Sequence, residues 1–231
     1  VESTANMRGE TFVAGMNLQV PAKRMMLFAN YGWLKQESDA DGAFSVPANS
    51  YDLGTEWGPA MGVPRHSVSG MFSMPLVTNM RLALNGGVRS GTPYNITTGR
   101  DDNADTVFND RPAGVARNSA RTETTWDFGG RVSYAFGFGQ RPPAGGGGAH
   151  GGQPTMIIQR VGGAAGSELS GGFGGVADNK RIRFELFASG FNLFNAVNRV
   201  GYSGVMTSPF FGQPTAATPG RRVDVGVRVG F

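Results

Sequence analysis

The last eleven residues, Arg221-Arg-Val-Asp-Val-Gly-Val-Arg-Val-Gly-Phe231, alternate between apolar side chains and polar or small ones. Valines stand at every second position from Val223 to Val229, and Phe231 continues the series. A period of two is that of a β-strand, in which successive side chains point to opposite faces of the sheet. This stretch therefore predicts a strand with one apolar face and one polar face.

Six earlier segments alternate in a similar way and are predicted to be strands. They cover residues 11–20, 25–35, 66–75, 79–89, 125–138 and 181–191. Each is about ten residues long, nearly twice the common strand length of about 5–6 residues and about what a tilted strand needs to cross a bilayer. No apolar run reaches the roughly 18 residues that indicate a transmembrane helix. The sequence therefore predicts an all-β protein with about seven long antiparallel strands.

The connections between these strands alternate in length. Short ones lie around Pro21–Lys23 and Leu76–Thr78, whereas long ones cover residues 36–65, 90–124 and 192–220. Outer-membrane β-barrels have short periplasmic turns and long extracellular loops. With the C-terminus in the periplasm, the alternation places all three long loops on the outside. A soluble sandwich has no reason to alternate in this way.

Residues 139–179 break this pattern, because they form the longest connection on the expected periplasmic side. Fourteen glycines fall in the segment, and few of its residues are charged. Such a composition buries too little surface to offset the entropy of ordering, so we expect a flexible linker, with Thr155–Gln159 as a candidate short strand. The glycine-rich tract lacks the GxxxxGK[ST] pattern of phosphate-binding loops.

The overall composition excludes several functional classes. The 231 residues carry a formal charge of +4, but the arginines are scattered singly or in pairs, so nucleic-acid binding is not expected. The absence of cysteine excludes disulfides, thiolate metal sites and cysteine nucleophiles. Residues 1–20 lack the pattern of a secretory signal, so the signal of an exported chain would have been removed or would lie upstream of Val1.

The chemistry of the two strand faces favours lipid on the apolar side. The polar faces hold glycine, serine, asparagine and arginine, which suits a wet, crowded interior, whereas soluble exteriors usually carry more lysine and glutamate. Aromatic residues also stand near strand ends, as in the interfacial girdles of membrane barrels. These residues are Tyr31, Trp33, Trp126, Phe136, Phe138 and Phe231. We therefore expect a transmembrane β-barrel segment.

Three stretches carry a family resemblance. They are Ser90–Gly99 with Asn109–Pro112, Gly190–Asn195, and the closing strand Arg221–Phe231. In combination they resemble the C-terminal part of TonB-dependent outer-membrane receptors, in particular the Oar-like group, whose members carry a carboxypeptidase-regulatory-like domain. The resemblance spans nearly the whole chain.

The resemblance implies a location in the outer membrane and a barrel of about 22 strands filled by a plug, which takes up a ligand with energy from the TonB complex. It also implies that the barrel-assembly machinery reads the strand ending in Phe231. About seven strands cannot close so wide a wall, so we expect a fragment, a partial barrel wall that lacks the plug and the segment contacting TonB. Two alternatives stay open: a complete small outer-membrane protein, structural or adhesive, and a soluble β-sandwich binding module.

The sequence predicts no catalytic, cofactor-binding or metal site, and an enzyme is not expected. Neither GxSxG nor HExxH occurs, and the two histidines, His66 and His150, lie far apart in the sequence. Asp101, Asn103 and Asp105 have the spacing of a calcium loop. A glycine at the sixth position and a glutamate at the twelfth are missing, which leaves calcium binding and a polar turn as open alternatives.

Charged residues on the polar strand faces are the remaining candidates for a site. We expect cross-strand pairs that stiffen the wall, with docking of the plug or steering of an anionic ligand as the alternative. The residues concerned are Arg81, Arg89, Asp127, Arg131, Arg183, Glu185, Arg222, Asp224 and Arg228.

Overall fold

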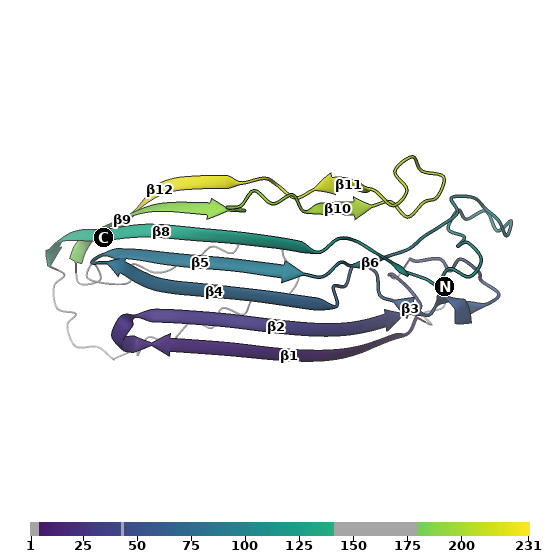
Figure 1. Ribbon diagram of the computed structural model, residues 1–231, viewed down its shortest axis with the longest axis horizontal. Helices are drawn as coiled ribbons and strands as arrows, with labels where there is room; N and C mark the ends of the chain where they lie inside the picture. Colours follow the sequence, from purple (N-terminus) through teal and green to yellow (C-terminus); the bar gives the residue numbers. More distant parts are fainter. Residues whose placement is uncertain (1–4, 43, 141–179) are drawn as a thin grey trace.

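The computed structural model describes residues 5–42, 44–140 and 180–231, which form one large antiparallel sheet (Figure 1). Its long strands, in spatial order, are β1 (Met7–Val20), β2 (Met25–Ser38), β4 (His66–Val77), β5 (Met80–Arg89), β8 (Thr125–Gln140), β9 (Lys180–Phe191) and β12 (Arg222–Gly230). The short β3 (Gly58–Pro59) pairs with the end of β2. The prediction of an all-β protein with long antiparallel strands is confirmed.

Several strands run further than the alternation predicts. β1 begins at Met7, and its ladder with β2 continues to the pair Met7 and Ser38. β8 continues to Gln140, so the predicted linker loses its first two residues, and residues 141–179, with His150 and Thr155–Gln159, lie outside the described part. At the start of β1 and the end of β2 both strand faces are largely polar. Such a segment shows no alternation of apolar and polar residues, although the backbone ladder continues through it.

The strand registers place the predicted apolar faces side by side. Leu18 lies opposite Leu27 and Leu27 opposite Phe72, whose other neighbour is Leu84. Farther across the sheet, the same side carries Val132, Ala188 and Val225 as register partners. Because the period of a strand is two, correct register on every ladder is what gathers all apolar side chains on one face.

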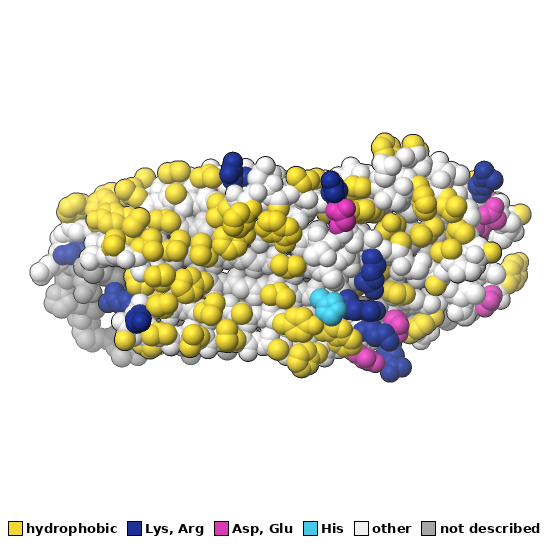
Figure 2. All heavy atoms as spheres, viewed as in Figure 1, with side chains coloured by type: hydrophobic (Ala, Val, Ile, Leu, Met, Phe, Trp, Pro, Cys, Tyr) yellow, Lys and Arg dark blue, Asp and Glu magenta, His cyan; other side chains and the backbone are white. Residues whose placement is uncertain are grey.

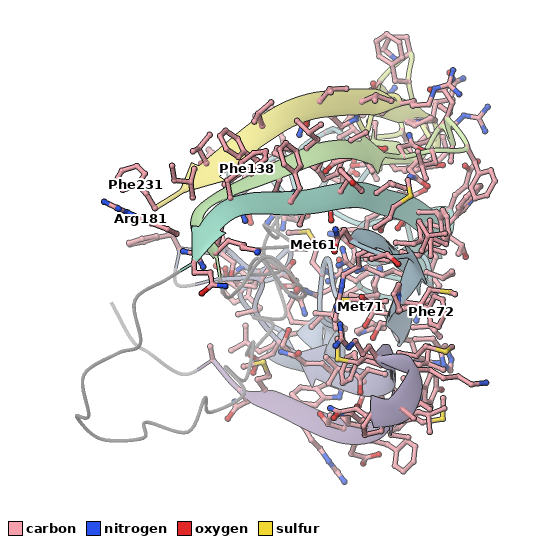
Figure 3. The ribbon with its side chains drawn as sticks, turned by 90° about the vertical axis from the view of Figure 1, so that its left-hand side faces the viewer. Met61, Met71, Phe72, Phe138, Arg181 and Phe231 are labelled. Carbon is pink, nitrogen blue, oxygen red and sulfur yellow. The ribbon has the colours of Figure 1, made fainter. Side chains whose placement is uncertain are left out.

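The sheet is curved, and its apolar face is the convex one. Figure 3 looks along the strands and shows Phe72 outside the curve and its neighbour Met71 inside. Figure 2 shows hydrophobic side chains covering most of the convex face over the strands, with charged side chains at the left end and, in larger number, in the right-hand half near the histidine. β1 and β12 are the two edges of the sheet, so the described strands do not close on themselves.

The short turns lie at one end of the sheet, which we call the turn end. The first turn contains the 3-10 helix η1 (Pro21–Lys23) and ends at Arg24, whose N–H donates to the carbonyl oxygen of Pro21 at 3.0 Å. The second connects β4 to β5 through Thr78 and Asn79. Both turns lie on the left in Figure 1, where β12 also ends.

The three long connections lie at the opposite end, which we call the loop end (Figure 1). They contain short elements that the sequence did not predict. These are η2 (Leu53–Glu56) and β3 in the first loop, β6 (Pro93–Tyr94) and β7 (Ala120–Arg121) in the second, and β10 (Arg199–Tyr202) paired with β11 (Pro214–Ala217) in the third. β6 pairs with β7 inside the second loop and β10 with β11 inside the third, whereas β3 ties the first loop to β2.

The helices of the described residues are all too short or too polar to span a bilayer.

Candidate functional site

The distribution of buried residues is the reverse of that of a water-soluble domain. Among the described residues, the buried hydrophobic ones are Ala48 and Ala60, and the other buried residues, apart from glycines and Pro93, are polar or charged. Val225 on the convex face is 80% exposed, whereas Glu185 on the concave face is 4% exposed. Water-soluble proteins bury valine and leave glutamate exposed. The candidate functional site therefore consists of the two faces of the sheet, the exposed apolar convex face and the polar concave face.

Aromatic side chains gather toward the loop end of the convex face. Tyr31 stacks on His66 with ring centroids 6.2 Å apart, and its hydroxyl lies 2.9 Å from Nδ1 of His66. Farther across the sheet, Phe194 packs against Phe128 with centroids 5.2 Å apart and against Trp126 at 6.0 Å. His66 thus serves as an aromatic neighbour of Tyr31.

A second aromatic cluster lies toward the turn end of the same face. Phe136 stacks on Phe184 with ring centroids 5.3 Å apart, and Phe138 meets the edge of Phe136 at 5.8 Å. Tyr134 completes the cluster at 5.9 Å from Phe136. Two aromatic groups thus flank the aliphatic middle of the convex face.

The concave face holds an ion-pair cluster across three strands. Glu185 on β9 accepts a hydrogen bond from Nη2 of Arg131 on β8 at 2.9 Å, and its other carboxylate oxygen lies 3.4 Å from Nη1 of Arg228 on β12. The guanidinium of Arg131 also lies over the ring of Phe187, 3.9 Å from its centroid. Two cations share one carboxylate in this cluster, so it retains a positive charge.

The other predicted concave charges are arranged differently. Arg81 donates to the hydroxyl of Ser73 at 3.3 Å, and Arg222 pairs with Asp224 on its own strand at 3.1 Å. Arg183 lies opposite Gly137 and Gly230 in the ladders. Arg89 and Asp127 form no ion pair with the described part of the chain. Among the ion pairs of the described residues, those around Glu185 join these charges across neighbouring strands.

The first two long loops are joined by buried polar contacts. Arg117 donates to the backbone oxygens of Ser38 and Glu56 and forms an ion pair with Asp41. Asn118, only 1% exposed, donates to Asp41 at 3.0 Å and to the carbonyl oxygen of Pro59 at 2.9 Å. The charged and amide side chains of one loop thus satisfy backbone groups of the other.

The third loop joins the second through backbone contacts. The N–H of Thr97 donates to the carbonyl oxygen of Gly204, and the N–H of Met206 donates to that of Thr97, each at 2.9 Å. Asn198 accepts from the N–H of Trp126 at 2.9 Å and donates to its carbonyl oxygen at 2.8 Å. All three long loops therefore belong to one connected unit at the loop end, which we call the loop cap.

The stretch Gly190–Asn195 has a structural role at the end of β9. Asn192 and Asn195 have φ values of 48° and 54°, a left-handed conformation that asparagine tolerates. The Asn195 side chain accepts from the N–H of Arg221 at 3.0 Å, just before β12 begins. The motif turns the chain away from β9 and places Phe194 on the aromatic cluster near Trp126.

Asp101, Asn103 and Asp105 form a compact polar turn. The Asp101 carboxylate accepts from the N–H groups of Asp105 at 3.0 Å and Thr106 at 2.9 Å, and Asn103 Oδ1 accepts from Asp105 at 2.9 Å. No group of three or more metal-ligating side chains exists among the described residues. The side-chain oxygens of Asp101 and Asn103, which would bind the metal in a calcium loop, accept hydrogen bonds from backbone N–H groups.

Two loop-end groups have shifted pKa values. The N–H of Asn6 donates to Asp39 at 2.7 Å, and this bond, with a second from the Asn6 side chain at 3.0 Å, lowers the pKa of the Asp39 carboxyl. Desolvation raises the pKa of the Tyr202 hydroxyl.

Sequence reasoning missed the residues that hold the loop cap together. Glu56, Arg117 and Asn118 lie in segments without periodicity, and their partners are about 55 or more positions away along the chain. The family resemblance did include part of the loop cap. Its stretch Asn109–Pro112 contains the buried Asp110 and Arg111, the partner of Glu56.

No protein-family model and no curated protein matches this chain. Its functional interpretation therefore depends on the geometry of the two sheet faces and of the loop cap.

Proposed function

We propose that the chain forms part of the wall of an outer-membrane β-barrel, and that this barrel is a TonB-dependent receptor that takes up a ligand across the outer membrane. The observation that carries the first step is the inverted distribution of side chains: an exposed apolar convex face and a polar concave face. Lipid is a solvent in which such a convex face is favourable, and water or a polar plug suits the concave face.

The length of the apolar face fits a bilayer. On β8 the outward residues from Trp126 to Phe138 span about 40 Å along the strand at about 3.3 Å per residue. At a tilt of about 45°, this corresponds to about 28 Å across the membrane, near the apolar band of about 25 Å in outer-membrane barrels. The two aromatic clusters then lie near the two interfaces, where aromatic girdles are found.

The two open edges support a larger barrel. β1 and β12 each leave one row of backbone N–H and C=O groups unpaired in the sheet. In hydrocarbon each unpaired group costs several kcal/mol, so further strands are needed on both edges. The remainder of the barrel and the plug are therefore the first partners of this chain.

The receptor assignment rests on the family resemblance of three stretches, including the strand before Phe231. In this proposal the barrel-assembly machinery recognises that strand, the TonB complex acts through the part of the receptor outside this chain, and the loop cap faces the exterior. No enzymatic activity is proposed.

Site-directed spin labelling tests the membrane step. The chain contains no cysteine, so single cysteines can be introduced without background labelling. Labels at Val225 and Phe72 on the convex face should collide with dissolved oxygen and be protected from a water-soluble nickel chelate. Labels at Ser69 and Ser189 on the concave face are the matched controls and should show higher accessibility to the chelate.

Protein-packed surroundings without lipid at Val225 and Phe72, or a soluble monomer without detergent, would overturn the membrane proposal in favour of a soluble binding module. Lipid contact at the convex face in a chain that closes its own edges would favour the small self-contained barrel over the receptor.

A further inference from the structure

The turn end of the sheet is basic. Lys23 and Arg24 form the exposed turn between β1 and β2, and Lys180 and Arg181 begin β9. Figure 2 shows dark-blue side chains at this end and no acidic side chain nearby on the visible face. In the described residues of this end (16–28, 73–84, 132–140, 180–186 and 226–231), Glu185 is the sole carboxylate side chain, and it is buried in the concave cluster.

Both basic pairs lie just beyond the apolar band. In the ladder between β8 and β9, Lys180 is opposite Gln140, two positions past the pair of Phe138 and Ile182. Two positions correspond to about 7 Å along a strand. Figure 3 shows Arg181 beside Phe231 at this rim, with Phe138 on the neighbouring outer face.

The turn between β1 and β2 repeats this arrangement. Lys23 and Arg24 lie in the turn that connects Val20 and Met25, the last pair of the β1–β2 ladder. The exposed Leu18 lies two positions before that pair. Cations thus stand at the same level of the sheet on strands that are not neighbours.

The loop end has the opposite charge. The three long loops, residues 39–65, 90–124 and 192–220, contain nine carboxylates and six arginines, a net charge of −3, although the whole chain has a net charge of +4. The charge is therefore polarised along the strands, with the positive end at the short turns. Scattered cations on an otherwise neutral protein would not produce this separation.

We propose that Lys23, Arg24, Lys180 and Arg181 form a basic rim that binds the headgroups of anionic phospholipids. The inference rests on the membrane location proposed above and adds a lipid class and an orientation to it. Lysine and arginine place their aliphatic stems along apolar surface and their charged heads at the phosphate level, and this is the level at which both pairs stand. The rim therefore holds the turn end in the leaflet that contains anionic phospholipid.

The position of the cations favours lipid over a compact acidic partner. The two pairs are separated by the strands β4, β5 and β8, so they do not form one pocket or patch. Each pair lies beside apolar outward-facing side chains, which a soluble acidic ligand would not need. Separate cations spread along an apolar border match a continuous layer of headgroups.

The test uses the barrel in which further strands complete the open edges of this chain, and compares its insertion into phosphatidylcholine vesicles and into vesicles with about 30 mol % phosphatidylglycerol. The rim variant is Lys23→Gln/Arg24→Gln/Lys180→Gln/Arg181→Gln. The matched control removes four loop-end cations, as Arg8→Gln/Lys35→Gln/Arg100→Gln/Arg199→Gln. Spin labels at Val225 report insertion, and sedimentation with vesicles gives the partition coefficient.

We expect the unmodified chain to prefer anionic vesicles by about fivefold for each cation engaged, and high salt to reduce this preference. The rim variant should insert into both vesicle types with a preference below about twofold, while the control keeps the preference. Equal insertion of the unmodified chain into both vesicle types, or equal loss in the control, would overturn the rim and leave the membrane proposal intact. Failure of the completed barrel to insert into any vesicle would overturn both the rim and the membrane proposal.

Discussion

Arg111 donates two parallel hydrogen bonds to the carboxylate of Glu56, at 2.9 Å and 3.0 Å, although the two residues are 55 positions apart in separate loops. Both side chains are nearly buried. The same carboxylate also accepts from the N–H of Ala48 at 3.0 Å and lies 4.0 Å from Nε of Arg117. One glutamate therefore links two long loops and compensates two buried guanidinium groups.

Replacing Glu56 with glutamine should loosen the loop cap. The substitution leaves the buried Arg111 without its charge partner, whereas Arg117 keeps its ion pair with Asp41, and breaking a buried pair in this way costs about 3–5 kcal/mol. Hydrogen exchange at the Ala48 amide measures the free energy of local opening. Glu123→Gln is the control, because its pair with Arg199 at 3.4 Å is exposed and should contribute no more than about 1 kcal/mol. Equal effects of the two substitutions would contradict the role of Glu56.

Gly204→Ala should separate the second loop from the third. A Cβ at this position would clash with the carbonyl oxygen of Asn95, which is backbone and cannot move aside without shifting the loop. The hydrogen bond from Thr97 to Gly204 should then lengthen, so the Thr97 amide should exchange faster. Gly42→Ala is the matched control, since a Cβ there meets no atom within 4 Å. An unchanged exchange rate at Thr97 would show that the loops are not closely packed at this point.

An arginine introduced on the convex face should destabilise the membrane-inserted state. Val225→Arg places a charge among lipid chains, which costs about 2–4 kcal/mol near the middle of a bilayer. Urea-induced unfolding from vesicles gives the free-energy difference. Ser69→Arg on the concave face is the comparison and should cost about 1 kcal/mol or less, because Ser69 lies opposite Asn30 and the small Gly87 on a polar surface. A larger penalty at Ser69 than at Val225 would reverse the assignment of the faces.

Acidification should release the junction between Asn6 and Asp39. The hydrogen bonds from Asn6 hold the pKa of Asp39 below its ordinary value of 3.8, so the carboxylate stabilises the folded state above that value. This contribution is lost as the pH falls through the lowered pKa of the folded state. The chemical shift of the Asn6 amide should titrate below pH 3.8 in the unmodified chain, and this titration should disappear in Asp39→Asn. A midpoint above 3.8 would contradict the direction of the shift.

The seven long strands could be predicted from sequence because alternation is a local signal. Each predicted strand overlaps an observed one. Errors occur where both faces are polar, as at Gln36 in β2, and at the end of β4, which continues through Leu76 and Val77 into the predicted turn. The alternation also predicted which side chains lie on the convex face, such as Leu18 and Leu84. It did not predict that the strand registers bring these two residues into one line across the sheet.

The loop cap could not be predicted in the same way. Its contacts join residues such as Glu56 and Arg111, and no periodic pattern relates positions so far apart. The calcium-like spacing at Asp101–Asp105 shows a related limit, because the same oxygens serve metal ions and backbone N–H groups equally well. Their orientation toward the N–H of Thr106 depends on the local turn, which includes a φ of 61° at Ala104.

The direction of the two edge strands limits how the sheet can be completed. Neighbouring strands alternate in direction along the path from β1 to β12, and that path has an odd number of members, so both edges run from the loop end to the turn end. Joining one edge directly to the other, or to a second copy in the same orientation, would create a parallel pair. An all-antiparallel closure therefore requires an odd number of additional strands, whichever polypeptide supplies them.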